Sequence, residues 1–149
     1  MPPSGGPPCP DPWRAAFVGE PTWVSLSPGE RLYKFVSLPV ARDRVLTSPW
    51  WIRQSAIDDL RRRAPHLGVR PADLARSRMA IAHEWNPGMD TVYIVALARQ
   101  ADGWEGRARS QPLTTASREV VFTGGGQQLC VPGLTWQHIG YGYSGTLIA

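Results

Sequence analysis

Fifteen prolines and fifteen glycines make up about a fifth of this 149-residue chain. Proline fixes φ and removes a backbone donor, and glycine loosens helices and strands from within, so both interrupt regular structure. A chain with this many interruptions is expected to form short elements joined by turns rather than long helices. Its length and its 42% hydrophobic content predict one globular domain with a core of its own.

The first twelve residues are rich in proline and glycine and are expected to form a disordered or extended tail. The single domain then spans residues 13–149. The beginning of the chain lacks the charged and apolar regions of a signal peptide. No apolar run approaches the roughly 18 residues of a membrane span. We therefore expect no membrane segment.

Two helices are predicted in the middle of the chain. Ser48 is a good N-cap and Pro49 a good first helical residue, so the first helix is expected from about Pro49 to Ala64, ended by Pro65. Its buried stripe would be Ile52, Ala56, Ile57 and Leu60. The second helix is expected to start at Pro71 and to reach about Ala80.

Strands are predicted on both sides of these helices. Residues 91–99 are apolar on both faces and should form a central strand. A hairpin turn at residues 101–103 would lead into a return strand at 104–110, and 111–118 is expected to be a loop. The other expected strands are 22–26, 31–36, 45–48, 119–122, 127–131 and one or two short ones near 140–143. The fold class is therefore α+β, with mixed or antiparallel twisted sheets.

Charge and the metal-binding residue types narrow the function only a little. The net charge of +4 and the pI near 9.6 suit an anionic partner, but no nucleic-acid recognition motif is present, so nucleic-acid binding ranks last. The two cysteines form no CxxC pair, and the three histidines are scattered without metal-ligand spacing. We therefore predict no metal site.

A glycine run stands out near the end of the chain, Gly124-Gly125-Gly126-Gln127-Gln128, directly before an apolar strand. Glycines without a Cβ let a ligand or a second strand approach closely. An amide at the lip of the strand is well placed to point into a cleft. Two upstream features accompany the run: a strand led by Arg31, and the turn Ser48-Pro49-Trp50-Trp51.

In this order the three features resemble the ADP-ribosyltransferase-like superfamily, and within it the NAD-glycohydrolase toxin domains of the tuberculosis necrotizing toxin type. In that family an Arg-bearing strand is followed by a Leu-Ser-Pro turn and, near the end, by a Gly-Gly-Gly-x-Gln element. The match runs in fragments from residue 30 to about residue 132. The resemblance implies an ADP-ribosyltransferase-like fold that takes NAD as its substrate.

Position by position, the resemblance places three residues at the reaction. Arg31 would hold the pyrophosphate or the nicotinamide ribose, Ser48 would lie beside the nicotinamide, and Gln128 would lie at the reacting ribose. A planar guanidinium suits phosphate oxygens, and an oriented ribose favours an oxocarbenium-like transition state. The residues expected to line the dinucleotide are Tyr33, Trp50, Trp51, Gly125 and Gly126.

The implied activity is hydrolysis of NAD to nicotinamide and ADP-ribose by a toxin or effector. Such a protein would stay in the bacterial cytoplasm or be delivered into a target cell by a secretion system, and an immunity protein would be its partner. Mono-ADP-ribosylation of an unknown acceptor is the alternative. The Glu-x-Glu signature of arginine-modifying transferases is absent near the glutamine, which favours hydrolysis.

Each of these residues also has a purely structural interpretation. Ser48 is equally well explained as a helix cap, Gln128 as a strand-end amide, and the tryptophans as core. His83 is a further polar candidate for catalysis, although a packed or surface histidine is the commoner case. The second alternative function is a non-catalytic, tryptophan-rich module that binds a sugar or a peptide.

Overall fold

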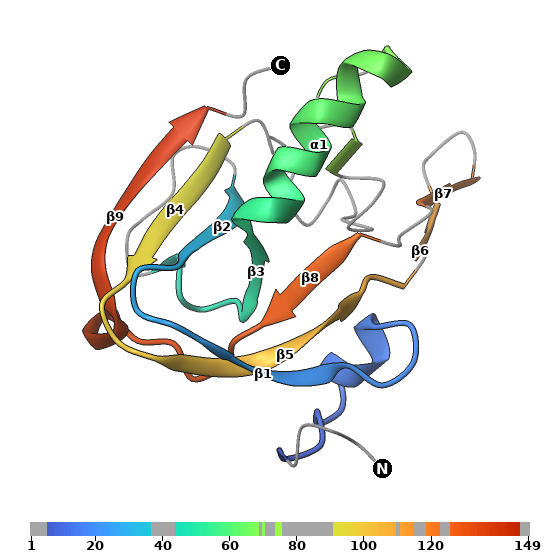
Figure 1. Ribbon diagram of the computed structural model, residues 1–149. Helices are drawn as coiled ribbons and strands as arrows, with labels where there is room; N and C mark the ends of the chain where they lie inside the picture. Colours follow the sequence, from blue (N-terminus) through green and yellow to red (C-terminus); the bar gives the residue numbers. More distant parts are fainter. Residues whose placement is uncertain are drawn as a thin grey trace.

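The computed structural model describes residues 6–36, 44–68, 70, 74–75, 91–109, 111–114, 119–122 and 126–146. These residues form a strongly curved seven-stranded sheet with the order β1-β5-β8-β3-β2-β4-β9 (Figure 1). Every pairing described is antiparallel. The strands are β1 (Thr22–Leu26), β2 (Arg31–Val36), β3 (Trp50–Arg53), β4 (Thr91–Leu97), β5 (Ala101–Arg107), β8 (Gln127–Cys130) and β9 (Ile139–Thr146).

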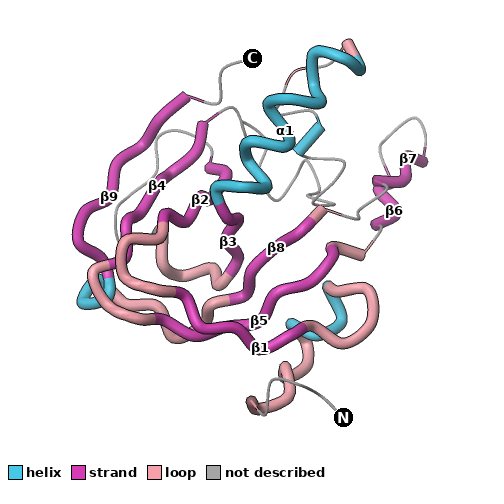
Figure 2. Tube along the Cα trace, in the orientation of Figure 1, coloured by secondary structure: helices cyan, strands magenta, loops and turns pink. Residues whose placement is uncertain are grey.

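The remaining elements flank this sheet. The helix α1 (Gln54–Leu67) follows β3 directly. A separate antiparallel pair, β6 (Gln111–Thr114) with β7 (Glu119–Phe122), lies apart from the main sheet (Figure 2). Short 3₁₀ turns occupy Trp13–Ala16 and Trp136–His138. The predicted α+β class with an antiparallel sheet is confirmed.

Local sequence pattern located several strands well. The strands predicted at residues 22–26 and 31–36 are β1 and β2 with the same bounds. The strand expected to be central, β4, lies between β2 and β9 and is buried on both faces, with Val92, Val95 and Leu97 at most 3% exposed. The strands predicted at 119–122 and 127–131 correspond to β7 and β8.

The predicted start of the first helix was wrong. Residues 50–53 form strand β3, which pairs with β2 on one side and β8 on the other, so Ser48 and Pro49 precede a strand and do not cap a helix. Hydrogen bonds from two neighbouring strands outweigh a local capping signal. The helix begins at Gln54, carries Pro65 inside its last turn, and ends where Gly68 adopts a left-handed φ of 69°.

Other expectations need smaller corrections. The segment predicted as a strand at 45–48 is a turn, in which the Thr47 amide donates to the Arg44 carbonyl. Residues 101–103 belong to β5, so the hairpin turns at residues 98–100 instead. The predicted loop at 111–118 contains β6. The second helix predicted at 71–80 lies mostly outside the described residues, where only Leu74 and Ala75 are seen in helical conformation; α1 is the one longer helix that the described part contains.

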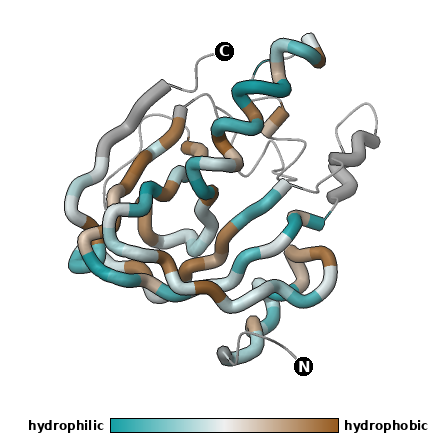
Figure 3. The backbone as a smooth tube through the Cα atoms, in the orientation of Figure 1, coloured by the Kyte–Doolittle hydropathy of each residue, from teal (hydrophilic) through white to brown (hydrophobic). Residues whose placement is uncertain are grey.

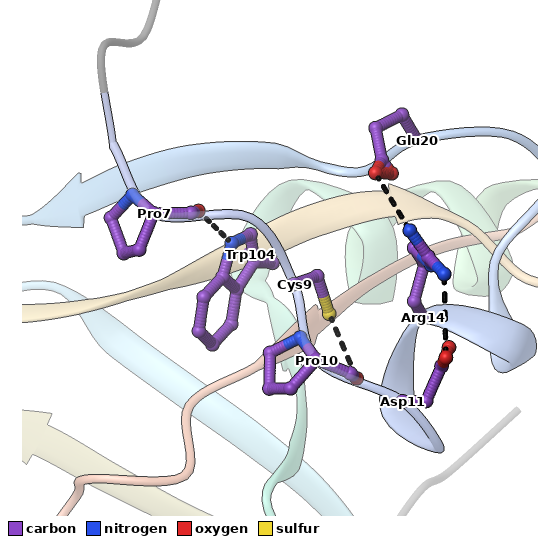
Figure 4. Close-up of polar contacts among 7 residues, drawn as sticks. All are labelled: Pro7, Cys9, Pro10, Asp11, Arg14, Glu20 and Trp104. Carbon is purple, nitrogen blue, oxygen red and sulfur yellow. Dashed lines mark hydrogen bonds and ion pairs between the residues drawn. The ribbon is translucent and has the colours of Figure 1, made fainter.

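The proline-rich segment that contains Pro7, Cys9 and Pro10 packs against the sheet (Figure 4). Trp104 Nε1 donates to the Pro7 carbonyl at 3.0 Å, and Cys9 is 3% exposed. Arg14 bridges Asp11 and Glu20 at 3.3 and 3.6 Å. Residues 6–12, expected to be disordered or extended, thus follow a path without helix or strand that lies on β5.

The two faces of the sheet bury different cores. Directly opposite residues in an antiparallel pair point to the same face. The face covered by α1, called here the helix face, carries a cluster of Tyr33, Phe35, Ile52, Ile57, Leu60, Ala75, Val92 and Ile94. Further along the same face, residues of the N-terminal segment cover Trp104 and Cys130. The opposite face buries Leu26, Leu32, Val45, Trp51, Val95, Leu97, Ala101, Leu129, Val131 and Leu134. The brown, apolar stretches therefore run along the strands, while α1 is largely teal (Figure 3).

Gly103 lies where β5 packs closely against β8. A Cβ at Gly103 would lie 2.4 Å from the Cys130 carbonyl oxygen, which is backbone and cannot move aside cheaply. We expect Gly103→Ala to lower the free energy of unfolding by about 2–4 kcal/mol, measured by urea denaturation. Gly133→Ala is the matched control, because nothing lies within 4 Å of its added Cβ. Equal stability of the two variants would contradict this packing.

Candidate functional site

The three strands that carry the sequence motifs are neighbours in the sheet. The order β8-β3-β2 places the strand after the glycine run, the strand after the Ser-Pro turn and the Arg-led strand side by side. Residues about 20 and 95 positions from Arg31 in sequence are thereby brought next to its strand. Only the tertiary pairing creates this arrangement, because β3 joins both of the other two strands.

Arg31 and Gln128 point to the same face of the sheet. Tyr33 is opposite Ile52 on β3, and Arg31, two residues earlier on β2, shares the face of Tyr33. Trp51 is opposite Leu129, so the next residue on each strand, Ile52 and Gln128, turns to the other face. Arg31, Tyr33, Ile52 and Gln128 therefore all lie on the helix face. From strand spacing, the Cα atoms of Arg31 and Gln128 are about 12 Å apart.

The amino end of α1 begins in this region. The Tyr33 hydroxyl donates to Gln54 Oε1 at 2.9 Å, which ties β2 to the first residue of the helix. The N-cap residue Arg53 makes no side-chain cap, and no acidic residue stands in the first turn, residues 54–57. The positive end of the helix dipole is thus not neutralised by its own first turn. Arg31, Tyr33, Gln54 and Gln128 are called here the amide–arginine site.

Gln128 is held by the N-terminal segment. Its Nε2 donates to the Ala16 carbonyl at 3.2 Å, and the same carbonyl accepts the Arg109 amide at 2.9 Å. Gln128 is half-buried, and the bond fixes the plane of its amide. The structural interpretation of this residue, an amide that satisfies backbone, is therefore realised.

The glycine run is described only from Gly126 onward. Gly126 is buried, and its carbonyl accepts the Ala108 amide at 2.8 Å, which joins the start of β8 to the end of β5. Gly125 lies outside the described residues, as does His83. Gly126 therefore contributes a backbone hydrogen bond two residues before Gln128.

Ser48 lies away from this site. It precedes β3 at the end opposite Arg53, five residues along the chain, on the order of 15 Å from the strand end that faces Arg31. Its carbonyl accepts Lys34 Nζ at 2.5 Å, and its hydroxyl accepts the Trp50 amide at 3.4 Å. The structure therefore gathers Arg31 and Gln128 but leaves Ser48 with Lys34.

The two predicted stacking residues, Trp50 and Trp51, point to opposite faces, as neighbours in a strand do. Trp50 packs on Phe17 with 5.5 Å between ring centroids on the helix face. Trp51 is 1% exposed in the core of the opposite face. Tyr33, 3% exposed, is likewise packed in the core under α1. One flat ring therefore cannot lie between both tryptophans.

Lys34 is the most perturbed cation of the described residues. It is 8% exposed, and its Nζ lies 4.4 Å from the centre of the Trp51 ring. Burial lowers the pKa of the Lys34 amine to about 7, because a buried ammonium loses its hydration. Nothing in the local sequence signals this burial, since Lys34 lies in an ordinary alternating strand.

Sequence reasoning also missed an ion cluster on the opposite face. Arg53 Nη1 lies 2.6 Å from Glu30 Oε1, and Arg53 Nε lies 2.7 Å from Glu105 Oε2. Glu30 and Glu105 lie 23 and 52 positions from Arg53 along the chain, and no local motif signals their meeting. Gln54 was likewise not predicted as a site residue, because no local motif marks it.

The described part of the chain contains neither a candidate metal site nor a helix that could span a membrane. No group of three or more histidine, cysteine, aspartate or glutamate residues there has the proximity to hold a metal ion. None of the helices described is both long and apolar enough to cross a membrane.

No family model and no curated protein matches the sequence. Two solved structures share its fold. Tne2, solved in complex with Tni2, matches with a TM-score of 0.52 over 86% of this chain and 92% of its own, at 17% identity. Rhs1-CT, solved in complex with its cognate immunity protein RhsI1, matches with a TM-score of 0.50 over 81% of this chain and 76% of its own, at 20% identity. At such low identity, these matches show that the chain has the fold of these two proteins.

Proposed function

We propose that this chain is a toxin or effector domain that hydrolyses NAD to nicotinamide and ADP-ribose. The observation that carries the proposal is the common placement of Arg31 and Gln128 on the helix face, on the two strands that flank β3. The two motif residues that bear the guanidinium and the amide thus lie on the same face of the sheet, separated by one strand. The assignment to the ADP-ribosyltransferase-like superfamily belongs to the same proposal.

In the proposed reaction, the amide–arginine site holds NAD by its charge. The Arg31 guanidinium and the amino end of α1 both attract the pyrophosphate oxygens. Gln128 orients the nicotinamide ribose. Water adds to the anomeric carbon as the glycosidic bond breaks; nicotinamide leaves with the bonding electron pair, and the water gives up one proton. The site accelerates the step by positioning both partners around an oxocarbenium-like centre.

A protein partner is part of this proposal. Rhs1-CT was solved with a cognate immunity protein and Tne2 with Tni2. A domain of this fold that degrades NAD would harm the cell that makes it, so we propose a cognate immunity protein. The chain's net charge of +4 favours an acidic partner.

The direct test is to incubate the purified protein with NAD and to quantify nicotinamide and ADP-ribose by chromatography. Equal amounts of the two products support hydrolysis. Nicotinamide without free ADP-ribose points to transfer to an acceptor, the alternative activity. No nicotinamide at micromolar enzyme over hours contradicts both activities.

The tryptophan-rich binding module gains no support from the described residues. Of the six tryptophans that the structure describes, Trp51 and Trp104 are buried and the other four are half-buried. A sugar platform needs an exposed indole face. The tryptophans in the described ranges therefore serve the cores.

A further inference from the structure

The sheet is joined at its middle by a very short strand. β3 has four residues and pairs with each neighbour through only two residue pairs. On one side lie β2, β4 and β9, and on the other β8, β5 and β1. Arg31 and Tyr33 stand on the first half and Gln128 on the second. The separation of the residues in the amide–arginine site therefore depends on this narrow join.

Arg53, the last residue of β3, bonds to both halves. Its Nη1 donates to Glu30, directly before β2, at 2.6 Å, and its Nε donates to Glu105, on β5, at 2.7 Å. The three side chains are 28%, 34% and 21% exposed, respectively, so the pairs are partly shielded from water. A planar guanidinium offers both donors in a fixed geometry, which a lysine cannot do.

Two members of this ion cluster are next in sequence to a residue of the site on the other face, and the third is next to the residue paired with Gln128. Glu30 precedes Arg31, and Arg53 precedes Gln54. Glu105 precedes Gly106, which pairs directly with Gln128. Fixing the three charged side chains on one face therefore fixes the backbone that carries the site on the other.

We propose that Arg53 is a positioning residue that clamps the two halves of the sheet and so sets the distance between Arg31 and Gln128. This inference rests on the proposed NAD hydrolysis. Arg53 does not touch the substrate in this scheme; it acts through the strand ends beside it. A reaction that depends on two residues whose Cα atoms are about 12 Å apart is sensitive to shifts of about 1 Å in either.

The test compares Arg53→Met with the triple variant Arg53→Met, Glu30→Gln, Glu105→Gln. In the single variant two carboxylates lose their shared cation and repel each other. In the triple variant the repulsion is gone but the clamp is still missing. We expect both variants to lose about tenfold or more in kcat for nicotinamide release, with a smaller change in KM. Arg53→Lys, which reaches one carboxylate at a time, should fall between them and the wild type. Recovery of wild-type kcat in the triple variant would overturn the proposal.

Arg62→Met is the matched control, because Arg62 also pairs with a carboxylate, Asp59, but on the exposed side of α1. It should keep the wild-type kcat. Hydrogen exchange separates the clamp from the proposed function. If the wild type releases no nicotinamide, the function fails, and the clamp is judged by the backbone amides of residues 50–54. Faster exchange there in Arg53→Met than in the wild type supports the clamp, and unchanged exchange overturns it.

Discussion

Arg31→Ala is expected to lower kcat/KM for nicotinamide release from NAD by about 100-fold or more. Arg31 opens β2 on the helix face, two residues from Tyr33, whose hydroxyl bonds the first residue of α1. Its guanidinium is the charge proposed to hold the pyrophosphate. Arg31→Lys should recover only part of the loss, because an ammonium cannot make the paired bonds of a guanidinium to phosphate oxygens. Steady-state kinetics with NAD measures both variants.

Arg62→Ala controls for the loss of one positive charge. Arg62 is exposed on α1 and pairs with Asp59, away from the amide–arginine site. Surface ion pairs of this kind contribute about 1 kcal/mol or less, so neither activity nor stability should change much. A Tm measured for each variant separates lost chemistry from lost folding. Near-wild-type kinetics in Arg31→Ala would remove Arg31 from the site.

Lys34→Met is expected to raise the free energy of unfolding at pH 6 by about 2–4 kcal/mol. The pKa of Lys34 falls from 10.5 to about 7 on burial, which corresponds to a cost of roughly 5 kcal/mol for the charged form. Methionine removes that cost and keeps most of the packing against Trp51. It also leaves the Ser48 carbonyl without its donor, which takes back about 1–3 kcal/mol.

The stabilisation expected from Lys34→Met depends on pH. Between pH 7 and 10.5 the unfolded chain binds more protons at Lys34 than the folded chain does, so wild-type stability rises with pH across that window. Below pH 7 the lysine is charged in both states and the cost is fully present. Urea denaturation from pH 6 to 9.5 should show the gap between variant and wild type closing as pH rises. Lys34 is the chain's only lysine, so no other lysine contributes. Parallel curves would contradict the burial of a charged amine.

Two strands of the fold, Arg31–Val36 and Thr91–Leu97, could be predicted from the local sequence pattern. The faces that a strand buries decide whether its residues alternate between polar and apolar or are apolar throughout. This pattern can be read directly from the sequence. β3 shows where local pattern fails. Ser48, Pro49 and a helical spacing of apolar residues all favoured a helix there. Pairing to β2 and β8 made the same residues a strand, because hydrogen bonds to two neighbours decide a four-residue segment.

The candidate site could also be predicted from the sequence only in part. The sequence supplied Arg31 and Gln128 through a resemblance of motifs, but it also supplied Ser48, which the fold carries to the other end of β3. The ion cluster of Arg53, Glu30 and Glu105 has no sequence signal, because each charge taken alone is an ordinary surface residue. Spatial proximity across strands is not encoded at any fixed spacing.

The sequence by itself determined that this chain is an α+β domain of short elements with a strand buried on both faces, because breakers and hydrophobic periodicity act locally. The tertiary structure alone decided which charged and polar side chains meet. Strand order and register bring β8, β3 and β2 together, and those depend on the packing of the whole sheet. The faces that separate Trp50 from Trp51, and Arg31 from Arg53, follow from the same register.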